Sequence, residues 1–176
     1  MKEVALLFVL ILISSCSVAK NSEVKKRVEL PDMIQVDYKH NIYKNNRVYL
    51  MANISEARTY EKTDKIECSS IFAEIRNTKS ELTMRIKSDK AEINNATNDF
   101  YFRENVVIEK LDQDAEIRAQ EIVLNYNKNQ LFSEKPIEIH KKDGSVLKAT
   151  SMKSDLTSQV TEFKDMDLLY YNQEGK

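Results

Sequence analysis

Apolar and polar residues alternate with a period of two from Pro31 onward, rather than with the period of about 3.6 that marks a helix. In residues 81–87, for example, Leu82, Met84 and Ile86 fall on one side of an extended chain, and polar or charged residues fall on the other. Side chains of a strand point alternately to opposite faces, so each such segment has one apolar face. The sequence therefore predicts an all-β fold.

Turn-forming residues separate the alternating segments. Asp143-Gly144 lies between two strand-like segments and is the strongest hairpin signal in the chain. Residues 94–98 and 127–129 are rich in asparagine and are further turn candidates. Short strands broken this often indicate a meander of about a dozen antiparallel strands.

The N-terminus has the pattern of a secretory signal: charged residues, an apolar segment over residues 4–13, and then Ser14 and Ser15 before Cys16. The apolar segment is shorter than the roughly twenty residues that span a bilayer. Together with Ile13, these residues resemble the lipobox of bacterial lipoproteins, whose cysteine is acylated. We expect a signal peptide over residues 1–15 and a lipid on Cys16; a short uncleaved anchor is the alternative.

The rest of the chain divides into a tether and one domain. Residues 16–30 are polar and charged, as expected of a tether that carries the lipid, and residues 31–176 are enough for one domain with its own core. With Cys16 acylated, Cys68 is the only other of the 2 cysteines, so no internal disulfide is expected. Cys68 is interpreted as a small buried strand residue without a function.

Several classes of function are disfavoured. The formal net charge of −1, with both signs interspersed, provides no basic surface for nucleic acid, and 2 glycines leave no glycine-rich phosphate loop. His40 and His140 lie far apart, and neither has other metal ligands at a suitable spacing. No nucleophile or acid–base motif is present, so we expect no catalytic residue, no metal and no cofactor.

The apolar strand faces themselves are the candidate site. They either close on each other as a sandwich or line an open groove, and periodicity does not separate these alternatives. A groove would bind acyl chains by burial alone, at roughly 0.8 kcal/mol per methylene, without any motif. The residues predicted to line it are Leu82, Met84, Ile86, Ile93, Phe102, Val106, Ile108, Ile117, Ile122, Leu124, Ile137, Ile139 and Phe163.

Several segments of the domain, taken in their order along the chain, also match a known pattern. An apolar strand precedes Asn-Val-x-Ile, a strand that starts with small residues leads to an aromatic turn, and a Ser-x-x-Pro-Ile step precedes a hairpin. The segments are residues 91–93, 100–108, 119–126, 131–139 and 148–150. In this order they resemble the LptC family, the membrane-anchored periplasmic components of lipopolysaccharide export, and more broadly the OstA-like β domain.

The resemblance implies a single open β-jellyroll that binds lipopolysaccharide or lipooligosaccharide in its groove, without enzymatic activity. Such domains stack edge to edge through main-chain hydrogen bonds. An N-terminal edge near residues 34–53 would face the inner-membrane ABC transporter. A C-terminal edge near residues 160–171 would pair with a soluble OstA-like bridge protein, and the protein would sit on the periplasmic side of the inner membrane.

Two features depart from the typical LptC pattern. A lipid on Cys16 replaces the family's transmembrane helix, and Ser17 after the acylated cysteine is more typical of lipoproteins sorted to the outer membrane. An outer-membrane location therefore stays open. The alternative function is a structural or adaptor lipoprotein of the envelope, with a closed β-sandwich and no lipid path.

Overall fold

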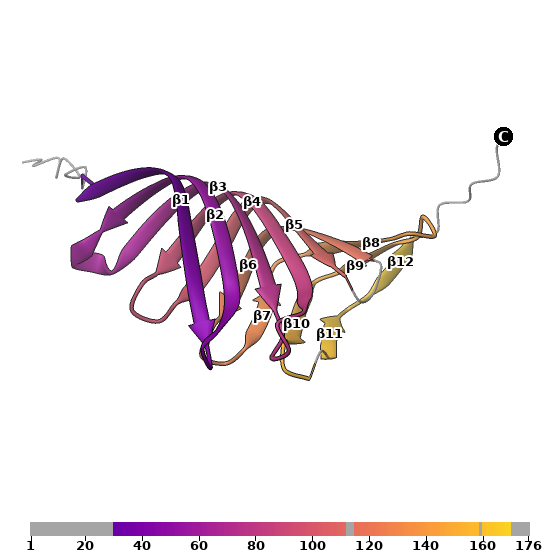
Figure 1. Cartoon of the computed structure of the whole chain (residues 1–176). Helices are drawn as coiled ribbons and strands as arrows, with labels where there is room; N and C mark the ends of the chain where they lie inside the picture. The colour runs from indigo at the N-terminus through magenta and orange to yellow at the C-terminus, as the bar shows by residue number, and fades with distance from the viewer. Residues whose placement is uncertain (1–29, 112–114, 159, 170–176) are drawn as a thin grey trace, which may run out of the picture.

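The structure is a computed structural model that describes residues 30–111, 115–158 and 160–169. These residues form one antiparallel sheet of 12 strands and one turn of 3-10 helix, η1 (Glu61–Thr63) (Figure 1). The prediction of an all-β fold with about a dozen antiparallel strands is confirmed. The predicted signal peptide, Cys16 and the tether up to residue 29 lie outside the described residues.

The long strands come first and pair in chain order. They are β1 (Met33–Lys44), β2 (Arg47–Tyr60), β3 (Lys65–Arg76), β4 (Leu82–Asn94), β5 (Asp99–Lys110) and β6 (Ala115–Asn125). The shorter strands that follow are β7 (Gln130–Ser133), β8 (Ile137–Lys141), β9 (Val146–Ala149), β10 (Ser151–Asp155), β11 (Val160–Lys164) and β12 (Asp167–Leu169).

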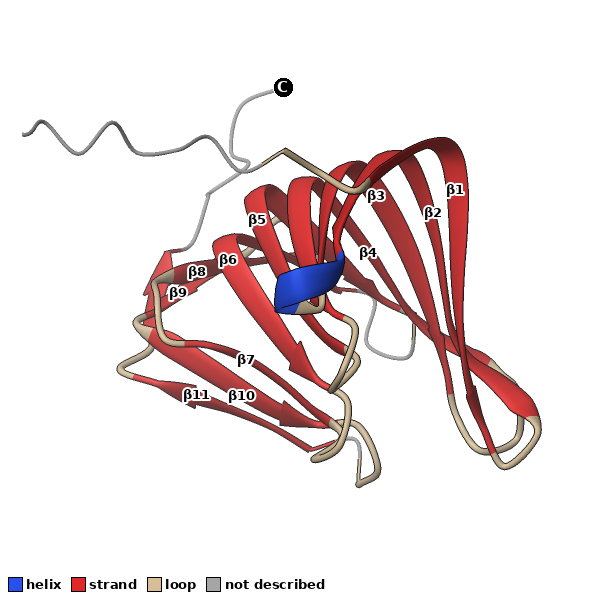
Figure 2. Cartoon of the chain, turned by 90° about the vertical axis from the view of Figure 1, so that its left-hand side faces the viewer, coloured by secondary structure: helices blue, strands red, loops and turns tan. Residues whose placement is uncertain are grey.

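The sheet forks at β6. Residues 123–125 of β6 pair with β7, whereas residues 115–119 pair with β8. The break between β7 and β8 contains Pro136, which has no N–H to donate to a neighbouring strand. One branch then continues from β7 to β10 and β11, and the other from β8 to β9 and β12, so the two branches lie apart in Figure 2.

The long strands bend along a line that continues into this fork. Asp37 in β1, Ser70 in β3, and Glu104 and Asn105 in β5 have positive φ angles of 53°, 50°, 61° and 51°. The register of β5 shifts beside Glu104 and Asn105 on both of its sides, with β4 and with β6, so β5 has a bulge at these two residues. Bulges and left-handed residues bend a strand, so the line of bends folds the single sheet into two layers (Figure 2).

We call the two halves the first and second layers. The first layer consists of residues 33–36, 56–60, 65–69, 90–94, 99–103 and 121–125 together with β7, β10 and β11. The second layer consists of residues 38–44, 47–54, 71–76, 82–87, 106–110 and 115–119 together with β8, β9 and β12.

The core lies between the inner faces of the two layers. One cluster of buried apolar side chains extends from Ile42 in β1 to Met152 in β10. The ring of His40, in the second layer, packs edge-on against the ring of Phe100 in the first layer, with centroids 5.8 Å apart. Cys68 is buried among them as predicted, and burial raises the pKa of its thiol to about 12.

The predicted turns are confirmed. Gly144 has a φ of 82° in the hairpin between β8 and β9, where its N–H donates to the carbonyl oxygen of Lys141 at 3.0 Å. Asn98 and Asn129 take the left-handed positions, with φ of 58° and 49°, in the turns after β4 and β6. These conformations suit glycine and asparagine, which explains why these residue types mark the turns.

The two predicted edges are only partly correct. β1 is an edge, but residues 47–53 belong to β2, which pairs with both β1 and β3, so the free N-terminal edge is narrower than predicted. The C-terminal edge is double, because the chain turns between Lys164 and Asp167 and β11 ends one layer while β12 ends the other. Tyr170 and Tyr171 lie outside the described residues. Within the described residues, no helix has the length and apolar character needed to cross a membrane.

Candidate functional site

The structure brings almost all of the predicted groove residues together between the layers. The cluster of apolar side chains contains Met84, Ile86, Ile93, Phe102, Val106, Ile108, Ile117, Ile122, Leu124, Ile137 and Ile139 as buried residues, with Phe163 half-buried against it. Leu82 is the exception. It is half-buried at the start of β4, beside a bulge at Thr83 that interrupts the alternation, and it lies outside the cluster.

Other side chains of the same interior are absent from the predicted set. Leu50 and Ile54 in β2, Ile75 in β3, Phe100 in β5 and Leu131 in β7 are among the largest fully buried side chains. The signal that reveals them is the same period-two alternation, which continues through β2 and β3. The inner surface is thus wider than predicted and reaches Ile42 in the edge strand β1.

The interior is filled by its own side chains. Phe100 and Phe102 stack with ring centroids 5.7 Å apart, and both are fully buried. Near β11 the interior becomes polar, because the Lys110 ammonium, on a side chain 7% exposed, donates to Thr161 Oγ1 at 3.0 Å. The Ser154 and Thr161 hydroxyls are 2.9 Å apart in the same place. Apart from this polar end, the chemistry that the interior offers is burial of apolar groups.

Charged side chains cover the outer faces. Arg85, for example, lies between the carboxylates of Glu74 and Glu109, at 3.5 and 3.6 Å. Similar cross-strand pairs link Arg103 with Glu92 and Glu121. Because these pairs are partly exposed, each contributes little to stability. They do make the outer surface unsuited to acyl chains, which leaves the space between the layers as the apolar site.

An opening of about 740 Å³, which we call the mouth, lies where turns of the two layers meet. The β1–β2 and β3–β4 turns of the second layer form one side, and Asn129 and residues 156–158 of the first layer form the other. Ile75 and Leu156, which belong to the interior packing, also line it. The mouth therefore borders the apolar interior.

Tyr49 and Lys44 hold the mouth together. Tyr49 has no partner in β1 because the register shifts between Ile42 and Tyr43, and its ring packs edge-on against Tyr126 with centroids 5.6 Å apart. The Lys44 ammonium lies 5.5 Å from the centre of the Tyr49 ring and donates to Asn129 Oδ1 at 2.8 Å. These contacts join β1 and β2 to the turn between β6 and β7 beside the mouth.

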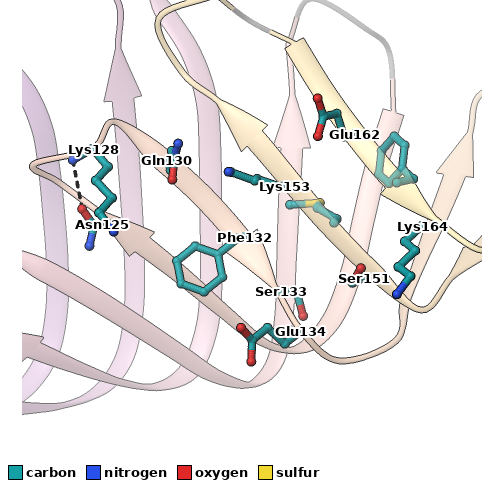
Figure 3. A pocket seen from close by; sticks show the side chains of 12 residues that line it. Asn125, Lys128, Gln130, Phe132, Ser133, Glu134, Ser151, Lys153, Glu162 and Lys164 are labelled. Atoms are coloured by element: carbon teal, nitrogen blue, oxygen red, sulfur yellow. Dashed lines mark hydrogen bonds between the residues drawn. The ribbon is translucent and has the colours of Figure 1, made fainter.

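A second hollow, of about 500 Å³, lies at β7, β10 and β11 (Figure 3). Phe132 and Lys153, which are opposite each other in the register of β7 and β10, line it together with Glu162 and other charged residues. Within the described residues, no group of three or more His, Cys, Asp or Glu side chains could hold a metal ion.

Comparison with known proteins decides the family. The model of the family described as lipopolysaccharide-assembly, LptC-related, matches residues 4–167. The chain belongs to this family. Membership confirms the resemblance found in the sequence, and it makes this LptC-related chain a component of lipopolysaccharide assembly and transport rather than an enzyme. No curated protein sequence matches the chain.

A solved structure shares the fold. It is LptH from Pseudomonas aeruginosa, described as the LptA-homologous periplasmic component of the conserved lipopolysaccharide transport device. The two superpose with a TM-score of 0.53 at 8% sequence identity, over 69% of the LptC-related chain and 94% of LptH. At this identity the likeness concerns the fold alone, and it confirms the predicted open β-jellyroll.

Proposed function

We propose that this LptC-related protein is a lipid-anchored periplasmic carrier that holds the acyl chains of lipopolysaccharide, or of a lipooligosaccharide, between its two layers. It receives the lipid from an inner-membrane ABC transporter and passes it to the next β-jellyroll protein. The observation that carries the proposal is the single apolar interior that extends from β1 to β10 between two sets of free strand edges.

Acyl chains suit this interior because most of its side chains are apolar and bind a ligand by burial rather than by directional polar contacts. Each buried methylene contributes roughly 0.8 kcal/mol, so a chain of many methylenes is held without any directional contact. The charged outer faces offer no competing apolar path. Since the interior is filled in the free protein, lipid enters by separating the layers and replacing contacts such as the one between His40 and Phe100.

The free edges suit transfer between proteins. β1 leaves one side of its backbone unpaired, and Ile34 and Val36 on this strand are 57% and 72% exposed. An edge strand of another domain can add to it by main-chain hydrogen bonds. We assign β1 to the transporter side, because the tether leads into it, and β11 with β12 to the soluble OstA-like bridge protein.

The anchor keeps the domain close to the membrane. A lipid on Cys16 would leave residues 17–30 as a tether with a reach of at most roughly 50 Å. Two or more acyl chains hold a protein stably on a bilayer, whereas one chain does so only weakly. We assign the anchor to the periplasmic face of the inner membrane; anchoring in the outer membrane, favoured by Ser17, is the other outcome.

Photo-crosslinking in cells tests the lipid path. A photo-reactive residue at Ile108 or Ile139, which are 0% and 5% exposed, should give an adduct with lipopolysaccharide that depends on ATP hydrolysis by the transporter. The same residue at Arg118, whose side chain is 57% exposed, is the control and should give none. Absence of the adduct from an exported, folded protein would show that the interior stays closed.

The second candidate is an envelope adaptor without a lipid path. It is favoured by the complete burial of Phe100, Phe102 and Ile108 in the protein alone, as in a closed sandwich. An adaptor would still pair through its edges, so it would co-purify with its partners and yet give no lipid adduct at Ile108. The crosslinking experiment therefore separates the two functions.

A further inference from the structure

Basic side chains gather at the mouth. Lys44, Arg47, Arg76 and Lys79 line it, and among the described residues of this lining only Glu81 carries a carboxylate. Arg76 is paired with the Glu74 carboxylate at 3.2 Å, which leaves Lys44, Arg47 and Lys79 as the source of the positive charge. The whole chain has a formal net charge of −1, so this excess of positive charge is a local feature. A concave surface lined by one sign of charge attracts ligands of the opposite sign.

Two of these cations are positioned without being neutralised. Arg47 Nη1 donates to the carbonyl oxygen of Thr78 at 2.6 Å, and Lys44 Nζ donates to the side-chain oxygen of Asn129 at 2.8 Å. Both acceptors are uncharged. Each bond therefore fixes a side chain at the mouth and leaves its positive charge for a ligand.

Tyr49 supplies an independent observation. Its hydroxyl is buried and finds no hydrogen-bond partner among the described residues. Burial raises the pKa of Tyr49 to about 12, so the hydroxyl stays protonated and can donate. Buried hydroxyls are normally paired, so an unpaired one beside an opening is available to donate a hydrogen bond to a ligand. Tyr49 and Thr83 both line the mouth at bulges, which often redirect side chains next to binding sites.

We infer that the mouth binds a phosphate group of the transported amphiphile, with Arg47 and Lys79 facing its charge and the Tyr49 hydroxyl donating a hydrogen bond. The acyl chains then pass Ile75 and Leu156 into the interior. This inference rests on the proposed function, because it assigns the headgroup end of the same lipid. A free phosphate ion offers the same chemistry, so the experiment must separate the two sources.

The test measures how the lipid adduct depends on phosphate. In membrane vesicles that contain the ABC transporter and ATP, the full-length protein with a photo-reactive residue at Ile108 is illuminated with subsaturating lipid A, either carrying its phosphate groups or dephosphorylated. We expect about tenfold more adduct with the phosphorylated lipid, since losing charge-assisted hydrogen bonds weakens binding by about this factor.

Three variants assign the effect to the mouth. Arg47→Gln combined with Lys79→Gln should abolish the preference for the phosphorylated lipid, whereas Arg118→Gln on the outer face should keep it. Tyr49→Phe should reduce the preference severalfold and leave the melting temperature of the lipid-free protein unchanged or higher, because the hydroxyl makes no bond there. If Tyr49 had only a packing role, Tyr49→Phe would leave the preference for the phosphorylated lipid unchanged.

The remaining outcomes are distinguishable. Equal adduct yields with both lipids would overturn the inference and leave the proposed function standing. If yields are equal and inorganic phosphate binds to the wild type but not to the double variant, measured by phosphorus NMR, the mouth is a free-anion site and the headgroup assignment is wrong. Absence of adduct with either lipid would overturn the proposed function and the inference with it.

Discussion

A single residue, Ile108, tests whether the inner face of a strand tolerates substitution less than the outer face. Its side chain is 0% exposed within the apolar cluster. Ile108→Ala should lower the free energy of unfolding by about 2–5 kcal/mol, through lost burial and the cavity left behind. Ile108→Asp should lower it further, because a carboxylate would be buried without a partner. Urea unfolding monitored by circular dichroism measures both.

The matched control is the neighbouring residue on the opposite face. Val107 is half-buried on the outside, opposite Lys87 in β4 and Arg118 in β6. An aspartate there would lie between two cations, so Val107→Asp should change stability by less than about 1 kcal/mol. Similar losses for Ile108→Asp and Val107→Asp would contradict the assignment of the faces.

The sequence predicted the interior residue by residue wherever the alternation was regular. Met84, Ile86, Ile117 and Ile139 were identified by this pattern alone and are buried together. Leu82 lies outside this cluster because a bulge beside it adds a residue to β4, and a bulge leaves the pattern of residue types almost unchanged. Sequence alternation thus defines a face only between irregularities.

At the scale of elements, the bend in β3 depends on Ser70, which is exposed and has a φ of 50°. A β-branched residue is strongly disfavoured in this conformation, whereas glycine adopts it freely. Ser70→Val should therefore lower the melting temperature and destabilise the fold by about 1–3 kcal/mol. Ser70→Gly should be neutral or slightly stabilising. Thermal unfolding of the two variants measures this difference.

Ser69 provides the control for this prediction. It is also exposed, but it pairs in the ladder with Glu56 and Lys90 and is not among the residues with positive φ. Valine suits an ordinary strand position, so Ser69→Val should leave stability unchanged or raise it slightly. If Ser69→Val destabilised the protein as much as Ser70→Val, the bend would not be the cause.

The bends and one turn were not predicted, and the missed turn made the predicted N-terminal edge too wide. Asp37, Ser70 and Glu104 are polar residues at exposed positions, and in a sequence they cannot be distinguished from the solvated face of a straight strand. The turn at Asn45 and Asn46, with φ of 51° and 58°, separates β1 from β2 and was not identified. The number of strands and the turns at residues 94–98, 127–129 and 143–144 were therefore predictable, but the turn at Asn45 and Asn46 and the positions of the bends were not.

At the scale of the whole molecule, the contacts between layers decide whether the interior is a core or a groove. These contacts join residues far apart in the chain, such as His40 with Phe100 and Lys44 with Asn129. Alternation shows which face of a strand is apolar but not which strand lies opposite. The sequence therefore left the closed sandwich and the open groove as alternatives, and the energy of the contacts between layers is the quantity to measure.

His40 gives access to that energy through pH. Burial lowers the pKa of its imidazole, whose Nδ1 lies 3.1 Å from the Tyr38 hydroxyl oxygen and whose ring packs against Phe100. The unfolded chain then binds a proton more readily than the folded protein. Above the pKa of about 6.5 of the unfolded state, the imidazole is neutral in both states and the free energy of unfolding is not reduced by this site. As the pH falls from there through the lower pKa of the folded state, the unfolded chain takes up the proton first and the free energy of unfolding decreases.

The wild type should therefore lose stability between about pH 7 and pH 5, and His40→Gln should lose measurably less over the same interval. Urea midpoints at several pH values provide the comparison, because the other titrating groups are common to both proteins. If the protonated imidazole also opens the layers, the wild type at low pH should take up an environment-sensitive acyl probe more readily than His40→Gln. Parallel pH profiles for the two proteins would mean that His40 does not report on the contact between the layers.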